Sequence, residues 1–213
     1  MKEDYYSYTK KWFGRLAPFY DMVELFVSGV RDKVVEFTYA REGSIILDVC
    51  TGTGEQAFAF ARRGYDVVGI DLSEDMLEVA SEKNKYGNVE FEVADATNMP
   101  FNDNRFDVSS VSFALHDMPS TIRVKVLKEM VRVSRPKGIL IIVDYALPKN
   151  KIGRYLIRHL AKLYESKYYS EFLKTDIRSL LGKLGIEIEE ELPIMLGAAK
   201  VLKCLKEAMS TTR

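Results

Sequence analysis

Short apolar runs alternate with helical periodicity through the middle of the chain. Five runs are rich in β-branched and aromatic residues and have the length of strands: Ser44–Cys50, Asp66–Ile70, Val89–Ala94, Phe106–Phe113 and Ile139–Tyr145. Stretches between them, such as 119–133, repeat apolar residues three and four apart, as amphipathic helices do. This alternation predicts right-handed βαβ crossovers and an α/β fold, a Rossmann-like, doubly wound and mostly parallel sheet.

The two ends of the chain carry further elements. Apolar residues between 19 and 37 recur at helical spacing after Pro18, which fits a first helical turn. Beyond the fifth strand, the pattern predicts a basic amphipathic helix near 151–168 and another helix over 171–184. Two closing runs predict a C-terminal antiparallel hairpin that completes a seven-stranded sheet: Ile186–Leu192 and Leu196–Leu205. The segment Arg135–Gly138 is predicted to be a turn.

These elements are expected to form one domain over residues 1–213, a length that supports a single large core. We expect residues 1–42 to form a helical lid and residues 43–145 to form the cofactor-binding core. Residues 146–185 would supply helices on the substrate side, and residues 186–213 the closing hairpin.

Composition narrows the function classes. Thirty-one basic residues balance 31 acidic ones, so no net positive charge points to nucleic acid. Two cysteines are too few for a disulfide framework, and no His, Cys and carboxylate cluster has metal-ligand spacing. No signal-peptide pattern and no membrane-spanning run of about 18 apolar residues is present. We therefore expect a cytoplasmic protein without a metal.

Acidic and small residues follow the predicted strands at one edge of the sheet, where ligands bind in open α/β folds. Asp48 to Gly54 follow the first strand, and two glycines in a Gly-Thr-Gly turn allow close backbone approach. Asp71 follows the second strand, where a carboxylate can accept hydrogen bonds from a ribose diol. Asp95 and Ala96 follow the third strand, and the segment 112–117 follows the fourth. This phasing predicts a nucleoside-binding crevice.

Two cofactors suit such a crevice. A dinucleotide would place its pyrophosphate on the helix N-terminus behind Gly54, where Glu55 and Asp48 would repel it. S-adenosylmethionine lacks a phosphate and carries an ammonium and a sulfonium group, so acidic neighbours favour it. An oxidoreductase that uses NAD and a non-catalytic cofactor-binding module remain the alternatives.

Several motifs carry a resemblance to a known family. LDVCTGTGE (47–55), GIDLSEDMLEVA (69–80) and VADATNMPF (93–101) are similar to the first three motifs of class I S-adenosylmethionine-dependent methyltransferases. Within that superfamily, residues 13–37 and 110–118 resemble most the ubiquinone and menaquinone biosynthesis C-methyltransferases. His116 and Asp117 stand where those enzymes usually have an Arg-Asn pair. A small organic acceptor or a quinone precursor is therefore the implied substrate.

The resemblance implies roles for individual residues. Asp48 and the glycine backbone would hold the methionine part of the donor, and Asp71 would bind the ribose. Leu72 and Met76 would flank the adenine, with Asp95 and Ala96 at its edge. The complete predicted donor site is Tyr20, Asp48, Cys50, Thr51, Gly52, Thr53, Gly54, Asp71, Leu72, Met76, Asp95, Ala96, Ser112 and Phe113.

The predicted catalytic residues are His116 and Tyr20. Methyl transfer is an in-line displacement, in which a base is needed only where the acceptor must lose a proton. His116 follows the fourth strand and has a suitable ordinary pKa. The expected partner is a small-molecule acceptor, and no nucleic acid is expected. The helix near 151–168 is expected to cover the substrate side of the sheet, and transient membrane contact without insertion is the alternative. The chain would act as a monomer or homodimer.

Overall fold

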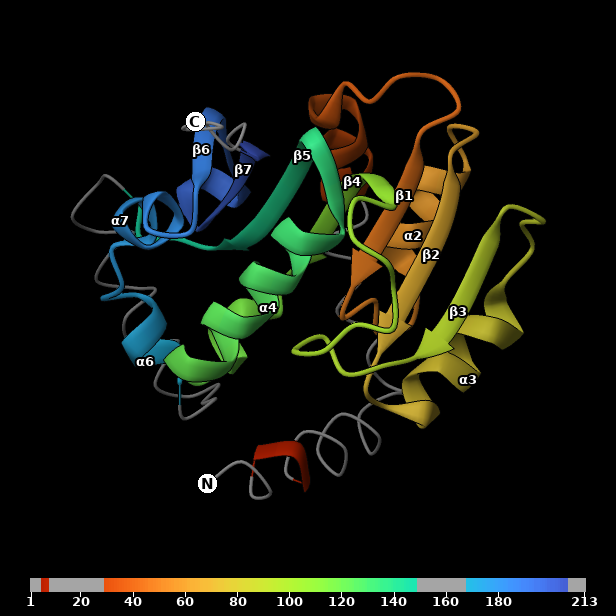
Figure 1. The fold of residues 1–213 in the computed structure, drawn as a ribbon, viewed down its shortest axis with the longest axis horizontal. Coiled ribbons are helices and arrows are strands. Elements are labelled where there is room, and N and C mark those ends of the chain that lie inside the picture. The colour runs from red at the N-terminus through yellow and green to blue at the C-terminus, as the bar shows by residue number, and fades with distance from the viewer. Residues whose placement is uncertain (1–4, 8–28, 149–167, 207–213) are drawn as a thin grey trace, which may run out of the picture.

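The computed structural model of the protein describes residues 5–7, 29–148 and 168–206 (Figure 1). One seven-stranded sheet runs through the molecule in the order β3-β2-β1-β4-β5-β7-β6. Its strands are β1 Ile45–Val49, β2 Asp66–Asp71, β3 Val89–Val93, β4 Phe106–Ser112, β5 Ser134–Tyr145, β6 Ile186–Ile194 and β7 Ala199–Lys206. The helices are residues 29–38, α2 Glu55–Ala61, α3 Glu74–Lys83, α4 Ser120–Val133, α6 Tyr169–Phe172 and α7 Ile177–Gly182.

The pairing confirms the predicted α/β architecture. Strands β1 to β5 pair in parallel, whereas β7 pairs antiparallel with both β5 and β6. The C-terminal hairpin therefore joins the sheet through its second strand. The reversal of strand order at β1 and β4 opens a crevice at their carboxyl ends, which is where ligands bind in folds of this kind.

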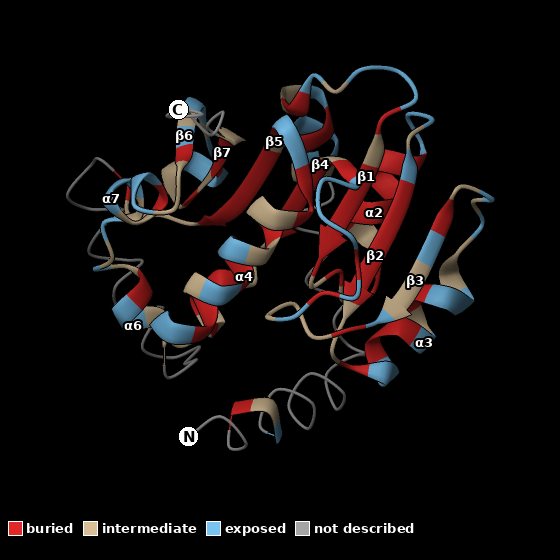
Figure 2. Cartoon of the chain, viewed as in Figure 1, coloured by how far each residue is buried: buried red, intermediate tan, exposed pale blue. Residues whose placement is uncertain are grey.

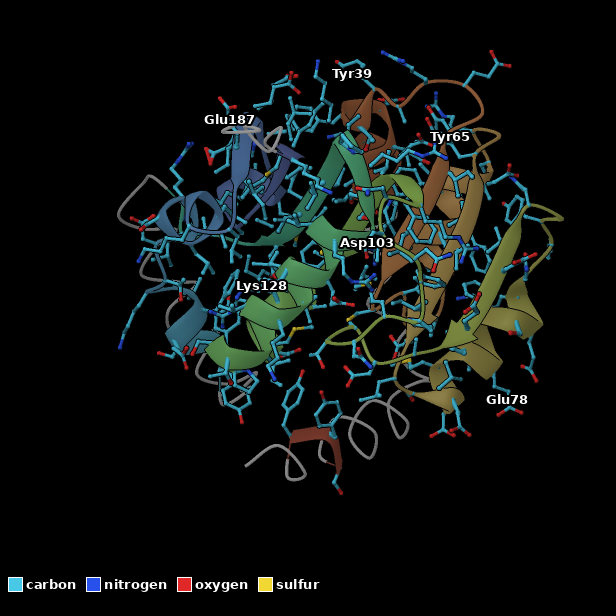
Figure 3. All side chains as sticks on the ribbon, in the orientation of Figure 1. Tyr39, Tyr65, Glu78, Asp103, Lys128 and Glu187 are labelled. Atoms are coloured by element: carbon cyan, nitrogen blue, oxygen red, sulfur yellow. The ribbon has the colours of Figure 1, made fainter. Side chains whose placement is uncertain are left out.

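Two apolar layers hold the sheet. On one face, α4 packs against Leu47, Val49 and Val111 of the central strands. On the other face, α2 and the helix over residues 29–38 cover Ile46 and Ile141. Figure 2 shows the central strands buried and the outer faces of the helices exposed. Charged side chains such as Glu78, Lys128 and Glu187 lie exposed in Figure 3.

Two predicted boundaries were wrong. Residues 135–138 lie inside β5 as a bulge, because the pairing with β4 jumps from Phe106 opposite Ser134 to Val108 opposite Ile139. The helix predicted over 171–184 is two short helices, because the Asp176 side chain accepts a hydrogen bond from the Ser179 N–H and caps a new helix start. The helix predicted near 151–168 lies outside the described residues except at Tyr168.

Candidate functional site

A cavity lies at the carboxyl ends of β1 to β4. Four carboxylates line it, one from the end of each of β1 and β2, one after β3 and one after β4. The lining residues are Tyr5, Tyr6, Arg31, Asp48, Cys50, Thr51, Gly52, Gln56, Ile70, Asp71, Leu72, Met76, Ala94, Asp95, Ala96, Thr97, Ser112, Phe113, Ala114, Asp117, Met118, Ile122 and Val126.

Asp48 is the most buried of the four carboxylates. It lies on β1 with 1% of its surface exposed and accepts a 2.6 Å hydrogen bond from the Thr51 hydroxyl. Burial raises the pKa of Asp48 to about 6, although the Thr51 hydrogen bond and the charge of Arg31 oppose the rise. A cation in the cavity would favour the ionised form, so the site is suited to a positively charged ligand.

The two glycines after β1 have different structural roles. Gly52 has a φ of +57° and lines the cavity, and a Cβ built on it would meet no atom within 4 Å. Gly54 has a φ of +85°, and a Cβ there would lie 2.8 Å from Cζ of Phe91. Gly52 therefore leaves room for a ligand, whereas Gly54 permits the start of α2 to pack against β3.

Asp71 ties the end of β2 to the glycine turn. Its Oδ2 accepts from the Gly52 N–H at 2.9 Å, and its Oδ1 accepts from the Ser73 N–H at 2.9 Å. Burial raises the pKa of Asp71, and these two backbone N–H groups counteract the rise. A carboxylate has about four lone-pair sites, so Asp71 can also accept from a ligand hydroxyl. Ser73 caps α3 as its position after Asp71 suggests.

Asp95 meets the N-terminal segment. Its Oδ1 accepts from the Thr97 N–H at 2.8 Å, and its Oδ2 accepts from the Tyr6 hydroxyl at 2.9 Å. Tyr6 and Tyr5 also line the cavity, and Figure 1 shows their short helical turn near the carboxyl ends of the strands. The N-terminus therefore contributes directly to the third strand end.

Two side chains in the cavity wall have buried polar atoms without a hydrogen-bond partner among the described residues. Both amide atoms of Gln56 and the hydroxyl of Ser112 have no hydrogen-bond partner within the described part of the chain. Gln56 is 2% exposed. Buried polar groups are nearly always paired, so these atoms indicate a ligand that both donates and accepts hydrogen bonds.

The ends of β4 and β5 form a second cluster. Phe113 has a φ of +52°, and the guanidinium carbon of Arg31 lies 5.7 Å from its ring centroid. His116 follows in a 3₁₀ turn, but it is 5% exposed and is not among the cavity-lining residues. Its Nδ1 lies 2.8 Å from Asp144 Oδ1, and its Nε2 lies 3.3 Å from Asp117 Oδ2. Asp117 does line the cavity.

Arg123 of α4 holds this turn in place. It is fully buried and donates to the backbone carbonyls of Leu115 at 3.1 Å and Met118 at 2.9 Å. Its Nη1 lies 3.2 Å from the hydroxyl of Thr175, beyond α6. One side chain of α4 therefore connects the turn that carries His116 and Asp117 to the segment after α6.

The structure brings the predicted donor residues of all four strand ends to one cavity, except Thr53 and Gly54, which do not line it. Tyr20 lies outside the described residues. The sequence analysis missed Tyr5, Tyr6, Arg31, Gln56, Thr97, Asp117 as a lining residue, and Asp144. Asp144 could have been noticed as the one charge in the apolar run over 139–145, and Gln56 as the only glutamine of the chain. Tyr6 gave no such signal.

The described residues contain neither a metal-binding cluster nor a membrane-spanning helix. In these parts of the chain, no group of three or more His, Cys, Asp or Glu side chains could hold a metal ion. No helix in the described ranges has the length and apolar character needed to cross a membrane.

Comparisons with known proteins agree with this geometry. The profile of a family described as a methyltransferase domain matches residues 46–138. A demethylmenaquinone methyltransferase of Thermotoga maritima is 35% identical over 176 residues, which cover 79% of this chain and 70% of that protein. A homologue of the same name from Paenarthrobacter aurescens is 36% identical over 158 residues, which are 70% of this chain and 61% of that protein. The chain thus spans about three fifths of the length of some of the curated relatives it matches.

Solved structures share the fold. Magnesium protoporphyrin IX methyltransferase from Synechocystis, with S-adenosylhomocysteine bound, superposes with a TM-score of 0.67 at 20% identity, over 84% of this chain and 83% of that one. The Thermotoga maritima relative, of which the match covers more than two thirds, places the chain in a family. The protein belongs to the class I S-adenosylmethionine-dependent methyltransferases.

Proposed function

We propose that this protein transfers a methyl group from S-adenosylmethionine to demethylmenaquinone in its reduced form. The observation that carries the donor assignment is the set of three carboxylates, Asp48, Asp71 and Asp95, facing one cavity. Arg31 is the single basic side chain among the described lining residues, so a pyrophosphate would find few counter-charges. A phosphate-free, cationic nucleoside fits this charge pattern.

The donor's parts match the strand ends in order. Asp48, the Gly52 backbone and the unsatisfied atoms of Gln56 and Ser112 suit the charged amino-acid end. The free lone pairs of Asp71 suit the ribose hydroxyls. Leu72, Met76, Asp95 and Ala96 suit the adenine, and Cys50, Thr51 and Phe113 complete the wall. When bound, the donor supplies an electrophilic methyl group.

Apolar and aromatic side chains form another part of the cavity lining. Among them are Met118, Ile122, Val126, Tyr5 and Phe113. These side chains suit a planar aromatic ring, and the curated relatives are named demethylmenaquinone methyltransferases. Alignment of acceptor and donor in this cavity can contribute roughly 7–11 kcal/mol of the barrier reduction. The catalytic role of Tyr20 stays a prediction.

One experiment tests both parts. The protein is incubated with methyl-labelled S-adenosylmethionine and a short-chain demethylmenaquinone kept reduced by dithionite, and products are identified by mass spectrometry. We expect a singly methylated quinone and one equivalent of S-adenosylhomocysteine. Calorimetric titrations with S-adenosylhomocysteine and NAD run in parallel. Binding of NAD alone would indicate an oxidoreductase. Binding of S-adenosylhomocysteine without turnover of this acceptor would refute the acceptor assignment.

A further inference from the structure

His116 is enclosed in the wall behind the cavity. The rings of Tyr145, Tyr169 and Phe172 surround its imidazole, with centroids 4.7, 5.6 and 6.3 Å away. The residue is 5% exposed and does not line the cavity. A molecule bound in the cavity would therefore meet the neighbours of His116 rather than its ring.

Asp144 of β5 fixes the orientation of that ring. Its Oδ1 lies 2.8 Å from Nδ1 of His116, and its Oδ2 accepts from the His116 backbone N–H at 3.1 Å. Asp144 is itself 4% exposed, and its Oδ1 also accepts from the Tyr145 N–H. Because an ionised carboxylate only accepts hydrogen bonds, Nδ1 of His116 must carry a proton here.

The opposite ring nitrogen faces Asp117. Nε2 of His116 lies 3.3 Å from Oδ2 of Asp117, whose side chain is 22% exposed and lines the cavity. With a proton on Nε2 as well, the ring is an imidazolium, and these two atoms then attract each other. The two carboxylates then share one positive charge between them.

The surroundings support the charged ring. Burial lowers the pKa of His116, but the charge and hydrogen bond of Asp144 and the charge of Asp117 raise it above its ordinary value. Arg123 of α4 opposes them. Burial, with the charges of Asp144 and Asp117, raises the pKa of Tyr169 on α6 to about 12, which keeps that phenol neutral. Tyr145 packs against the ring from β5.

We infer that Asp117 is the side chain that binds the acceptor, and that His116, held by Asp144, is a positioning residue that fixes Asp117 toward the cavity. This rests on the proposed methyl transfer. Because the Asp117 carboxylate accepts hydrogen bonds, it selects an acceptor that offers an O–H or N–H group beside the methylated atom. The hydroxyl of a reduced quinone belongs to this class.

The sign of the pH dependence follows from the same geometry. Above the raised pKa of His116, the ring loses its Nε2 proton while Nδ1 still donates to Asp144. Nε2 then becomes an acceptor opposite the Asp117 carboxylate, and the contact is lost. The KM for the acceptor should therefore rise on the alkaline side, whereas the affinity for S-adenosylhomocysteine should stay constant.

The test combines kinetics with a direct titration of the ring. The chain has only two histidines, so His159→Gln assigns the imidazole NMR signals of the other. Asp144→Asn should lower the titration midpoint of His116 by about 1 unit or more. The alkaline limb of the acceptor kinetics, measured with reduced short-chain demethylmenaquinone, should move by the same amount.

Two further variants separate positioning from structure. Asp117→Asn should raise the KM for the acceptor about 10-fold or more, with S-adenosylhomocysteine affinity within about 2-fold of wild type. His116→Gln keeps an amide donor near Asp117 without a titrating proton, so the alkaline limb should flatten. Asp103→Asn is the control, because Asp103 is an exposed carboxylate paired with Arg132 (Figure 3).

An unchanged KM in Asp117→Asn, with the wild type active, would overturn the role of Asp117. An unchanged His116 midpoint in Asp144→Asn would overturn the role of Asp144. If the wild type did not methylate the acceptor, the proposed function itself would be refuted. The NMR titration would still test whether Asp144 raises the pKa of His116.

Discussion

The carboxylates at the ends of β1, β2 and β3 each have a hydrogen-bond donor nearby in the chain, whereas the cluster at the ends of β4 and β5 is joined across a long stretch of sequence. Asp71 and Asp95 each accept an N–H from two residues onward, and Asp48 accepts the hydroxyl three residues onward. In the second cluster, His116 and Asp144 are 28 residues apart. The proposed donor site is therefore specified partly by local bonds, to which Gly52 and Tyr6 add long-range ones at Asp71 and Asp95, whereas the proposed acceptor site depends on the assembled fold.

Arg123→Leu probes the cluster at the ends of β4 and β5, and we expect it to have the largest effect on stability. It leaves the buried carbonyls of Leu115 and Met118 without donors, at a cost of about 1–3 kcal/mol each. We expect urea unfolding to show a loss of about 4 kcal/mol in the free energy of unfolding. Arg135→Leu, which breaks only the surface pair with Asp107, should cost less than about 1 kcal/mol. Equal losses would refute the comparison.

Asp48→Asn probes the most buried carboxyl group at the ends of β1, β2 and β3. The folded pKa of about 6 exceeds the ordinary 3.8, so ionising Asp48 destabilises the fold increasingly as pH rises from 4 to above 6. The variant should match wild type near pH 4 and gain about 3 kcal/mol at pH 8. Urea unfolding at both pH values measures this. A gain in stability that did not change with pH would contradict the raised pKa of Asp48. The control variant Asp103→Asn, at an exposed carboxylate, should show no gain in stability at pH 8.

Asp71→Ala tests the local end through affinity. Loss of two hydrogen bonds to the ribose should weaken S-adenosylhomocysteine binding about 100-fold in calorimetry. Because the Gly52 and Ser73 N–H groups also lose their acceptor, Asp71→Asn serves as the milder variant. Unchanged affinity in both variants would remove Asp71 from the donor site.

Substitutions of Gly52 and Gly54 should give the smallest effects, and the two should differ in whether they affect donor binding or stability. Gly52→Ala meets open cavity space, so its cost should be the left-handed strain of about 1–2 kcal/mol, together with weaker donor binding. Gly54→Ala adds a clash with Phe91 and should cost about 1–2 kcal/mol more in stability. Thermal unfolding and calorimetry on both variants measure these costs. The reverse ranking would show that the turn is built differently.

The same contrast explains what the sequence predicted. Strand runs, the glycine turn, Asp48, Asp71 and Asp95 could be predicted because their partners are neighbours in the chain or follow strand periodicity. The roles of Tyr6 and Asp144 could not, because Tyr6 meets Asp95 across 89 residues and Asp144 meets His116 only through sheet pairing. The break at Asp176 was missed because a cap competes with helical periodicity.

A crystal structure with S-adenosylhomocysteine tests the central claim most directly, namely that three strand-end carboxylates bind a phosphate-free nucleoside. We expect density with both ribose hydroxyls on Asp71, the adenine edge at Asp95 and the amino-acid end beside Asp48 and Gln56. Density that places the nucleoside elsewhere, with Asp48, Asp71 and Asp95 hydrogen-bonded only to groups of the protein itself, would contradict the account.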